Sequence, residues 1–346
     1  MKTNKNASKA TAWLAAPLLA LAGAVVPLAA QAAPTTASGA CDRQCMSSLV
    51  DQLLQSMVAR DPDRLPLARA YSASENSHPA ALGMMTLWSS VTRAGRPDLL
   101  AIDTVAGQAF FELQIEEGGS PSMLWGRVKV VDRKLSELEF FINRSRGDHG
   151  FSYSAKDAPA NLKRWMTPPR NRAKASRAEL EQLSRAAFST EVPYEIAVDP
   201  DCSFLEAGSK VIDPGLGDSD RPGDPNAPLG CMFPPFRPVD SKAREIVIDE
   251  ELGIVVDAGM VPGRVYPYPF YGHMISAFIP DQMKQAQDAQ QQWLDKQLVG
   301  KGAGLVKPMP AVGETMQVLQ VYDGKLQGSQ INVHLLGPGS RSLWVP

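Results

Sequence analysis

The sequence lacks the short motifs that mark common catalytic and nucleotide-binding sites. It has no Gly-x-Ser-x-Gly elbow, no phosphate-binding loop, no dinucleotide fingerprint and no EF-hand loop. These absences argue against a serine hydrolase, a kinase and an NAD-dependent dehydrogenase. Metal-ligand spacing is also missing, because the histidines (His78, His149, His273 and His334) are scattered and form no His-x-x-x-His pair. We therefore expect no metal site.

Basic residues are too few for a nucleic-acid binder. The chain has 35 basic and 37 acidic residues, and three of the lysines fall within the first nine residues, so removal of a leader there leaves a net charge of −5. No basic stripe interrupts this mildly acidic composition. We expect no nucleic-acid partner.

Long hydrophobic runs are scarce, and residues 12–30 form the single run that approaches transmembrane length. This run follows the three lysines, is interrupted by two prolines, and ends at Ala30-Gln31-Ala32. Basic, apolar and small-residue segments in this order are typical of a secretory signal, whereas a membrane anchor would be more hydrophobic. The sequence predicts a signal peptide at 1–32, a linker at 33–40, and an exported protein, periplasmic or extracellular, without membrane attachment after cleavage.

Cysteine is rare but even in number. An exported chain with Cys41, Cys45, Cys202 and Cys231 favours two disulfides. Four cysteines allow three connectivities, and we prefer the local pairs Cys41–Cys45 and Cys202–Cys231.

The mature chain divides into two α+β regions joined by a polar segment. The predicted limits are a first domain at 41–146, a linker at 147–175 and a second domain at 176–346, with an inserted Gly/Pro/Asp-rich loop at 206–240. Apolar periodicity predicts helices at 46–59 and 80–91 and strands at 106–116, 122–131 and 135–143. The second region begins with a helix whose Ser176 and Glu179 form a capping box. It continues with a hairpin at 244–258, a Gln-rich helix at 280–299 that we expect to be solvated, and strands at 314–322 and 326–336.

The two regions also resemble each other. Residues 124–143 and 315–334 align on their turns at an offset of 191, which pairs Asp132 with Asp323 and Lys134 with Lys325. Each match follows an amphipathic helix. The shared order of elements indicates an internal duplication.

Several segments resemble the cone-shaped α+β superfamily that includes nuclear transport factor, ketosteroid isomerase, scytalone dehydratase and the SnoaL-like polyketide cyclases. The resemblance lies in residues 49–63 and 124–139. Residues 41–45, 71–76, 87–88 and 244–251 are similar to tandem, two-domain secreted members of that superfamily. The resemblance implies two cone-shaped domains, each with helices packed on a curved antiparallel sheet, arranged as an internal pseudo-dimer, so that the protein is a monomer or a homodimer.

The resemblance also implies a kind of chemistry. Enzymes of this superfamily place an Asp, Glu, His or Tyr in an apolar pocket, where burial tunes its pKa for proton transfer without a metal or organic cofactor. In the first half, Tyr71, Glu75 and His78 are candidate catalytic residues, with Asn76 and Trp88 as ligand-binding neighbours. The alternative is a polar loop whose Glu and Asn cap the next helix.

Other candidates lie on the hairpin and in the second half. Arg127 could bind an anionic ligand, although a cross-strand pair with Glu139 is the simpler interpretation. Residues 266–273 form an unusual aromatic and proline-rich segment, which predicts a rigid loop that binds an aromatic ligand. Its candidate catalytic residues are Tyr271 and His273, and its candidate ligand-binding residues are Tyr266, Tyr268 and Phe270. This segment holds no carboxylate, so acid–base chemistry there would need a residue such as Asp257; alternatively, the loop only fills the domain core.

Two functions of different classes remain open. The first is a cofactor-independent lyase, isomerase or hydrolase that acts on a small, largely apolar molecule. The second is a non-catalytic, secreted module that binds a ligand or a partner. A closed apolar cavity with a desolvated acid or histidine would favour the enzyme, whereas two filled domains would favour the module.

Overall fold

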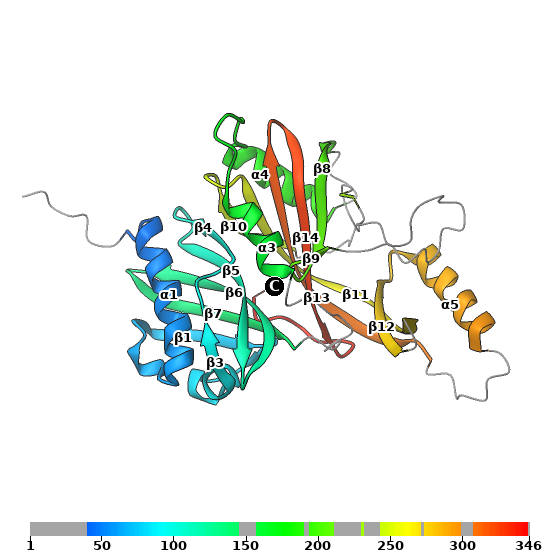
Figure 1. Cartoon of the computed structure of the whole chain (residues 1–346), viewed down its shortest axis with the longest axis horizontal. Coiled ribbons are helices and arrows are strands. Elements are labelled where there is room, and N and C mark those ends of the chain that lie inside the picture. The colour runs from blue at the N-terminus through cyan, green and yellow to red at the C-terminus, as the bar shows by residue number, and fades with distance from the viewer. Residues whose placement is uncertain are drawn as a thin grey trace, which may run out of the picture. The chain divides into compact units, whose positions relative to one another are not determined.

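Two β-sheets make up most of the structure, which is a computed structural model (Figure 1). It describes residues 40–144, 157–189, 194–210, 230–231, 243–270, 273–298 and 307–344, with the side chains of 267–277 and 297–298 left out. These residues belong to one compact unit.

The first sheet has seven strands in the order β2-β1-β7-β6-β5-β3, and β4 also pairs with β5. Their bounds are β1 (Leu67–Glu75), β2 (His78–Pro79), β3 (Val91–Ala94), β4 (Leu99–Asp103), β5 (Gln108–Glu117), β6 (Ser120–Val131) and β7 (Lys134–Asn143). The pair β1–β7 is parallel, whereas the other pairs are antiparallel.

The second sheet repeats this plan with the order β10-β11-β13-β14-β8-β9, and β12 also pairs with β11. Its strands are β8 (Ala197–Glu206), β9 (Ser209–Lys210), β10 (Arg244–Asp249), β11 (Ile254–Phe270), β12 (His273–Pro280), β13 (Met309–Tyr322) and β14 (Lys325–Leu336). Here β8–β14 is the parallel pair, so the path β2-β1-β7-β6-β5 of the first sheet recurs as β9-β8-β14-β13-β11, whereas the outer strand β12 follows β11 in the chain and β3 precedes β5.

The helices are fewer and mostly short. They are α1 (Arg43–Ala59), α2 (Leu87–Ser90), α3 (Ala158–Lys163), α4 (Arg177–Ala187) and α5 (Lys284–Leu298). Asp42 caps α1 by accepting a hydrogen bond from the Cys45 amide. The predicted capping box of Ser176 and Glu179 at the start of α4 is confirmed.

Three apolar clusters fill the space around the sheets. The apolar stripe of α1, which includes Leu53 and Met57, packs on one face of the first sheet against residues such as Phe111. The stripe of α4 packs on one face of the second sheet. Between the sheets lies the third cluster, in which Trp125 and Phe110 of the first sheet meet Val256 and Val318 of the second. Each sheet is therefore covered on one face by a helix and on the other by its counterpart.

The hairpins that the 191-residue offset aligns are β6–β7 and β13–β14. Both turn through two residues with positive φ, Asp132-Arg133 and Asp323-Gly324, as a tight two-residue hairpin turn requires. Both carry a bulge at the equivalent step, between Lys129 and Val130 and between Gln320 and Val321. The same local geometry at the same positions supports the internal duplication.

Reciprocal ion pairs join the two halves. Arg43, the first residue of α1, binds Asp249 of β10 through two hydrogen bonds of 3.0 and 2.7 Å. Arg177, the first residue of α4, binds Asp103 of β4 through two of 3.0 and 2.9 Å. Each aspartate also accepts a backbone amide from the opposite strand, at 2.8 Å for Asp249 and 3.1 Å for Asp103. The two contacts follow the pattern of a self-complementary twofold interface within one chain.

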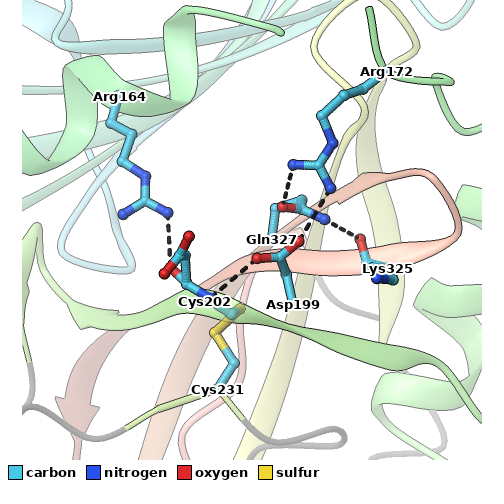
Figure 2. Close-up of a disulfide and its surroundings, with 8 residues drawn as sticks. Arg164, Arg172, Asp199, Cys202, Cys231, Lys325 and Gln327 are labelled. Atoms are coloured by element: carbon cyan, nitrogen blue, oxygen red, sulfur yellow. Dashed lines mark hydrogen bonds and ion pairs between the residues drawn. A yellow bond between two sulfur atoms is a disulfide. The ribbon is translucent and has the colours of Figure 1, made fainter.

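The structure confirms both predicted disulfides, Cys41–Cys45 and Cys202–Cys231. Figure 2 shows the second, which ties Cys202 of β8 to Cys231, and also shows Arg172 with Asp199 and Gln327. Arg172 donates to Asp199 at 3.1 Å and to Gln327 at 2.8 Å, and so holds β8 against β14. Two disulfides are consistent with a secreted protein.

The predicted fold class is wrong. The structure is mostly β, with two mixed seven-stranded sheets and few, short helices, rather than α+β cones of helices on curved antiparallel sheets. The predicted helix at 80–91 shrinks to the four residues of α2, because β3 takes over from Val91. Residues 68–76, whose sequence fits either a loop or a short strand, form most of β1. Glu206 ends β8 rather than beginning a loop.

Parts of the predicted organisation lie outside the described residues or remain predictions. The signal peptide at 1–32 lies outside them, as do 211–229 and 232–240 of the inserted loop. Residues 157–175 of the predicted linker include α3 and contribute Leu162 and Trp165 to the cluster between the sheets. The domain limits at 146 and 176 stay a prediction.

Candidate functional site

Glu75, the predicted base of the first half, stabilises the start of a helix. It ends β1, and one carboxylate oxygen accepts hydrogen bonds from the Thr86 amide at 3.0 Å and the Thr86 hydroxyl at 2.6 Å. The other oxygen accepts from the Leu87 amide at 3.0 Å. Three donors occupy the carboxylate at the first turn of α2, as in the capping alternative considered above.

The neighbours of Glu75 also have structural roles. Asn76 takes a left-handed conformation, with φ of 50°, and its side-chain oxygen accepts the Ile142 amide at 3.0 Å. Trp88 is buried, donates to Ser56 at 3.3 Å and meets Phe140 edge-on. His78 is exposed, with Nδ1 2.6 Å from the Asn76 carbonyl oxygen, and Tyr71 is 37 % exposed on β1. These side chains do not converge on a common pocket.

Arg127 is part of a charge network between the sheets. The side chain is fully buried, and its Nε lies 3.1 Å from Glu139 Oε2, which confirms the cross-strand pair. Its Nη1 donates to Glu137 and Gln108, each at 2.7 Å. The guanidinium also lies 4.7 Å from the centre of the Trp344 ring. Internal partners therefore hold Nε and Nη1, whereas the buried Nη2 has no hydrogen-bond partner among the described residues.

The aromatic segment of the second half is a hairpin rather than a loop. Tyr266, Tyr268 and Phe270 end β11, and they pair in register with Ala277, Ile275 and His273 of β12. Tyr271 lies outside the described residues.

A cavity of about 840 Å³ lies beside Tyr266, between this hairpin, α5 and the start of β13. Tyr266 is 3 % exposed and Leu294 of α5 is 1 % exposed, and the two form apolar parts of the lining. Burial raises the pKa of the Tyr266 hydroxyl. The volume lies within the range of about 300–1,000 Å³ usual for small-molecule sites.

Charged and amide side chains line the rest of this cavity. The complete polar lining is Arg264, Asp281, Lys284, Gln287, Asp288, Gln291, Asp295 and Lys307. The three carboxylates have internal partners, because Asp288 pairs with Lys284, Asp295 accepts from Gln291 at 2.9 Å, and Asp281 accepts from Gln287. Arg264 and Lys307 are exposed at this site. The lining thus combines an apolar patch with three cations, of which Lys284 is paired with Asp288, and three carboxylates.

The Gln-rich helix was expected to be solvated, and this is wrong in part. Gln287 and Gln290 are each 6 % exposed. The Gln287 amide donates to the Ile279 carbonyl at 3.1 Å and to Asp281 at 3.1 Å, so it fixes α5 to the end of β12. The helix forms one wall of the cavity for this reason.

Asp257 is a buried acid beneath α4. The side chain is fully buried, one oxygen accepts a short hydrogen bond from Ser184 of α4, and the other has no partner among the described residues. Burial raises the pKa of Asp257 to about 7, against the Ser184 hydrogen bond that lowers it and with a smaller contribution from Glu245 that raises it. A carboxyl tuned to this range can both release and accept a proton near neutrality.

The position of the first half that is equivalent to Asp257 holds an apolar residue, Phe111. Gly126 and Gln317 are aligned at the 191-residue offset, and the strand register pairs Phe111 with Gly126 as it pairs Asp257 with Gln317. Phe111 belongs to the apolar core, and a Cβ on Gly126 would lie 2.9 Å from its ring. Where the first half has the Phe111 ring over Gly126, the second half has the buried carboxyl of Asp257 beside the buried amide of Gln317.

The helices that pack on these positions, α1 and α4, differ in the same way. Val50 lies seven residues after Arg43, the first residue of α1. Ser184 lies seven residues after Arg177, the first residue of α4. Val50 packs in the apolar core, whereas Ser184 donates to Asp257. Two equivalent apolar positions on facing elements have thus become a hydrogen-bonded polar pair.

The structure does not bring Asp257 to the Tyr266 cavity. Both residues lie on β11, nine positions apart, which corresponds to about 30 Å along an extended strand. Other buried carboxyls also lie apart from that cavity, and burial raises the pKa of Glu112 to about 7 and that of Glu206 to about 7. Within the described ranges, no three His, Cys, Asp or Glu side chains are placed to hold a metal, and no helix is long and apolar enough to cross a membrane.

Comparisons with known proteins leave the family open. No family model matches the chain, and no curated protein matches it. One solved structure with some similarity is the crystal structure of a de novo designed protein with a curved β-sheet, at 12% identity. The match covers 30% of this chain and 88% of that one with a TM-score of 0.25, which carries no argument. The resemblance to the nuclear transport factor and ketosteroid isomerase superfamily stays a prediction.

Sequence reasoning found Tyr266 but missed the rest of its cavity. Arg264 and Lys307 are separated by more than forty positions, and no local motif links them. Ser184 looked like one polar position in an amphipathic helix. A comparison of the two halves position by position along the helices, Val50 against Ser184, would have marked it.

Proposed function

We propose that the protein is an exported ligand-binding module whose ligand occupies the cavity beside Tyr266. The observation that carries this proposal is the open cavity of about 840 Å³ with a buried aromatic and aliphatic patch and exposed cations at its edge. The first half supports the proposal indirectly, because its predicted catalytic residues are held by structural contacts and its interior is filled by Phe111, Phe140 and Trp88.

The lining indicates the kind of ligand. Tyr266 and Leu294 offer apolar surface to a flat or aliphatic group, whose transfer from water is favourable. Arg264 and Lys307 offer positive charge to an anionic group on the same molecule. We expect a small amphiphilic molecule with an apolar body and a carboxylate, sulfonate or phosphate.

Anilinonaphthalene sulfonate tests this proposal, since it combines an aromatic body with one anionic group and fluoresces when desolvated. The folded protein should bind one molecule, and Tyr266→Ala should weaken binding by tenfold or more. Tyr71→Ala is the matched control from the first half and should leave binding unchanged. Absence of binding, or equal loss in both variants, would remove the support for this site.

A second candidate function rests on Asp257. A fully buried carboxyl with an unpartnered oxygen and a pKa of about 7 supports cofactor-independent acid–base catalysis on a small molecule. Ser184 would position the carboxyl, and Asp257 would move the proton. This candidate retains the lyase or isomerase chemistry expected from the sequence but moves it from Glu75 to Asp257.

The generic substrate 5-nitrobenzisoxazole tests that candidate. A desolvated carboxylate removes the proton from its ring carbon while the nitrogen–oxygen bond breaks, which yields a coloured nitrile phenolate. The rate should rise with pH with a midpoint near 7 and vanish in Asp257→Asn. Glu112→Gln removes a buried carboxyl elsewhere and serves as the control. Equal rates in the wild type and Asp257→Asn would rule out an accessible base at this position.

A further inference from the structure

A second cavity, of about 590 Å³, lies on the first half and is lined mainly by hydroxyl and charged side chains. It lies at the end of the sheet where β5 turns into β6 through Gly118 and Gly119, both with positive φ. Its polar lining is Arg60, Thr86, Ser89, Ser90, Thr92, Glu117, Ser120, Ser122 and Arg144. No residue of the Tyr266 cavity takes part, so this is a separate place on the molecule.

Glu117 and Arg144 form the fixed centre of this hydroxyl groove. The Glu117 side chain is 9 % exposed and its two oxygens accept from Arg144 Nε and Nη2 at 3.0 and 3.1 Å. Ser90 and Ser122 each donate to it at 2.6 Å. Burial alone would raise the pKa of Glu117, but the hydrogen bonds from Arg144, Ser122 and Ser90 outweigh it and lower the pKa. The carboxylate is therefore ionised and saturated with donors.

Three more hydroxyl groups around this centre direct their protons into the protein. Thr86 donates to Glu75 at 2.6 Å, Ser89 to the Thr86 carbonyl at 2.9 Å, and Thr92 to the Glu116 carbonyl at 3.1 Å. A hydroxyl has one proton and two lone pairs, so these groups can only accept hydrogen bonds from a ligand. They form a row of acceptors that suits a ligand rich in O–H donors.

The remaining donors of the groove are cationic. Arg144 uses Nε and Nη2 internally, since Nη2 also donates to Thr86 at 3.2 Å, and among the described residues this leaves Nη1 for a ligand. Arg60, the left-handed C-cap of α1, adds a second guanidinium. Two arginines against one glutamate give the groove a net charge of +1.

We propose that this groove binds an acidic saccharide. Sugar hydroxyls would donate to Thr86, Ser89 and Thr92, and a carboxylate or sulfate on the sugar would accept from Arg60 and Arg144. The volume accommodates a molecule of one to three sugar rings. The inference assigns a ligand class to a surface that the proposed function does not use, and it holds whether or not the Tyr266 cavity binds a ligand.

Isothermal titration of the mature protein with trigalacturonic acid tests the proposal, with maltotriose as the neutral trisaccharide. The acidic sugar should bind, with at least tenfold preference over maltotriose. Arg60→Gln should weaken binding at least tenfold, and Thr92→Val, which keeps the side-chain shape, about threefold. Arg69→Gln replaces an exposed arginine on β1 outside the groove and should change nothing. All variants should keep the wild-type melting temperature.

Several results would overturn the proposal. These are no binding of trigalacturonic acid at millimolar concentration, equal binding of maltotriose, or equal losses in Arg60→Gln and Arg69→Gln. Displacement of the sugar by equimolar sulfate would reduce the site to a simple anion site and would also overturn it. Loss of fluorescent-probe binding at Tyr266 would leave these outcomes unaffected, so the two proposals fail separately.

Discussion

At the scale of single residues, the same side chain types act differently in the two halves. Glu75 is surrounded by three donors, whereas Glu206, which ends β8 as Glu75 ends β1, has an oxygen without a partner among the described residues. The register confirms the correspondence, because both glutamates precede a two-residue turn with positive φ. The position of a glutamate at the end of a strand alone does not show whether its carboxylate oxygens have hydrogen-bond donors.

Glu75→Gln should therefore lower stability rather than function. The amide presents one acceptor where the carboxylate presents two, and its NH₂ group would face the Leu87 or Thr86 amide. Loss of a helix-capping interaction of this kind costs about 1–2 kcal/mol. Urea unfolding of both proteins measures the difference. An unchanged unfolding midpoint would mean that the carboxylate is not needed at α2.

Asp257 should make stability depend on pH. Its pKa rises from 3.8 in the unfolded chain to about 7 in the folded protein. Between these values the folded state holds a proton that the unfolded state has released, so stability falls as pH rises through this window, by at most about 1.4 kcal/mol per pH unit, and is level above it. Asp257→Asn should flatten this fall between pH 4 and 7 in thermal melts. Parallel curves for both proteins would contradict the buried, neutral acid.

At the scale of secondary structure, the ion pairs Arg43–Asp249 and Arg177–Asp103 should contribute much of the stability of the contact between the halves. Asp249 and Asp103 are almost completely buried, while their arginine partners are only 29% and 28% exposed. Removing the arginine leaves a buried carboxylate with backbone partners alone. Arg43→Ala and Arg177→Ala should each cost about 2–3 kcal/mol, somewhat below the value for fully buried pairs.

The control for these two ion pairs is an exposed ion pair in the first half of the chain. Arg64→Ala breaks the pair with Asp61, whose side chains are 69% and 40% exposed, and should cost less than about 1 kcal/mol. Urea unfolding compares the three variants. Similar small losses of unfolding free energy in all three variants would show that the Arg43–Asp249 and Arg177–Asp103 pairs do not stabilise the contact between the halves.

Sequence periodicity predicted the long elements of this fold well. The helix of α1, the strands β5, β6 and β7, and the pair β13–β14 all follow strong apolar patterns over ten or more residues. It left open what tertiary pairing decides. Residues 68–76 are polar on their own and fit a loop or a short strand, and they form a strand because β7 offers a parallel edge.

At the scale of the whole molecule, the two halves share a topology but have diverged in their interiors. The first half keeps Val50, Phe111 and Gly126 as a closed apolar core, and the second half holds Ser184, Asp257 and Gln317 instead. The duplication was visible in the sequence from the aligned turns. The parallel strand pairs and the reciprocal ion pairs were not visible in the sequence, because they join residues more than sixty positions apart.

The central claim is that residues predicted as the site in the first half serve structure, while the cavity of the second half serves binding. Thermal melts of Glu75→Gln and Arg264→Gln, each with and without anilinonaphthalene sulfonate, test it most directly. We predict that Glu75→Gln melts earlier but keeps the full ligand-induced rise in melting temperature. Arg264→Gln should melt as the wild type does and lose most of that rise. The opposite pattern, with the ligand effect lost in Glu75→Gln and kept in Arg264→Gln, would contradict the account.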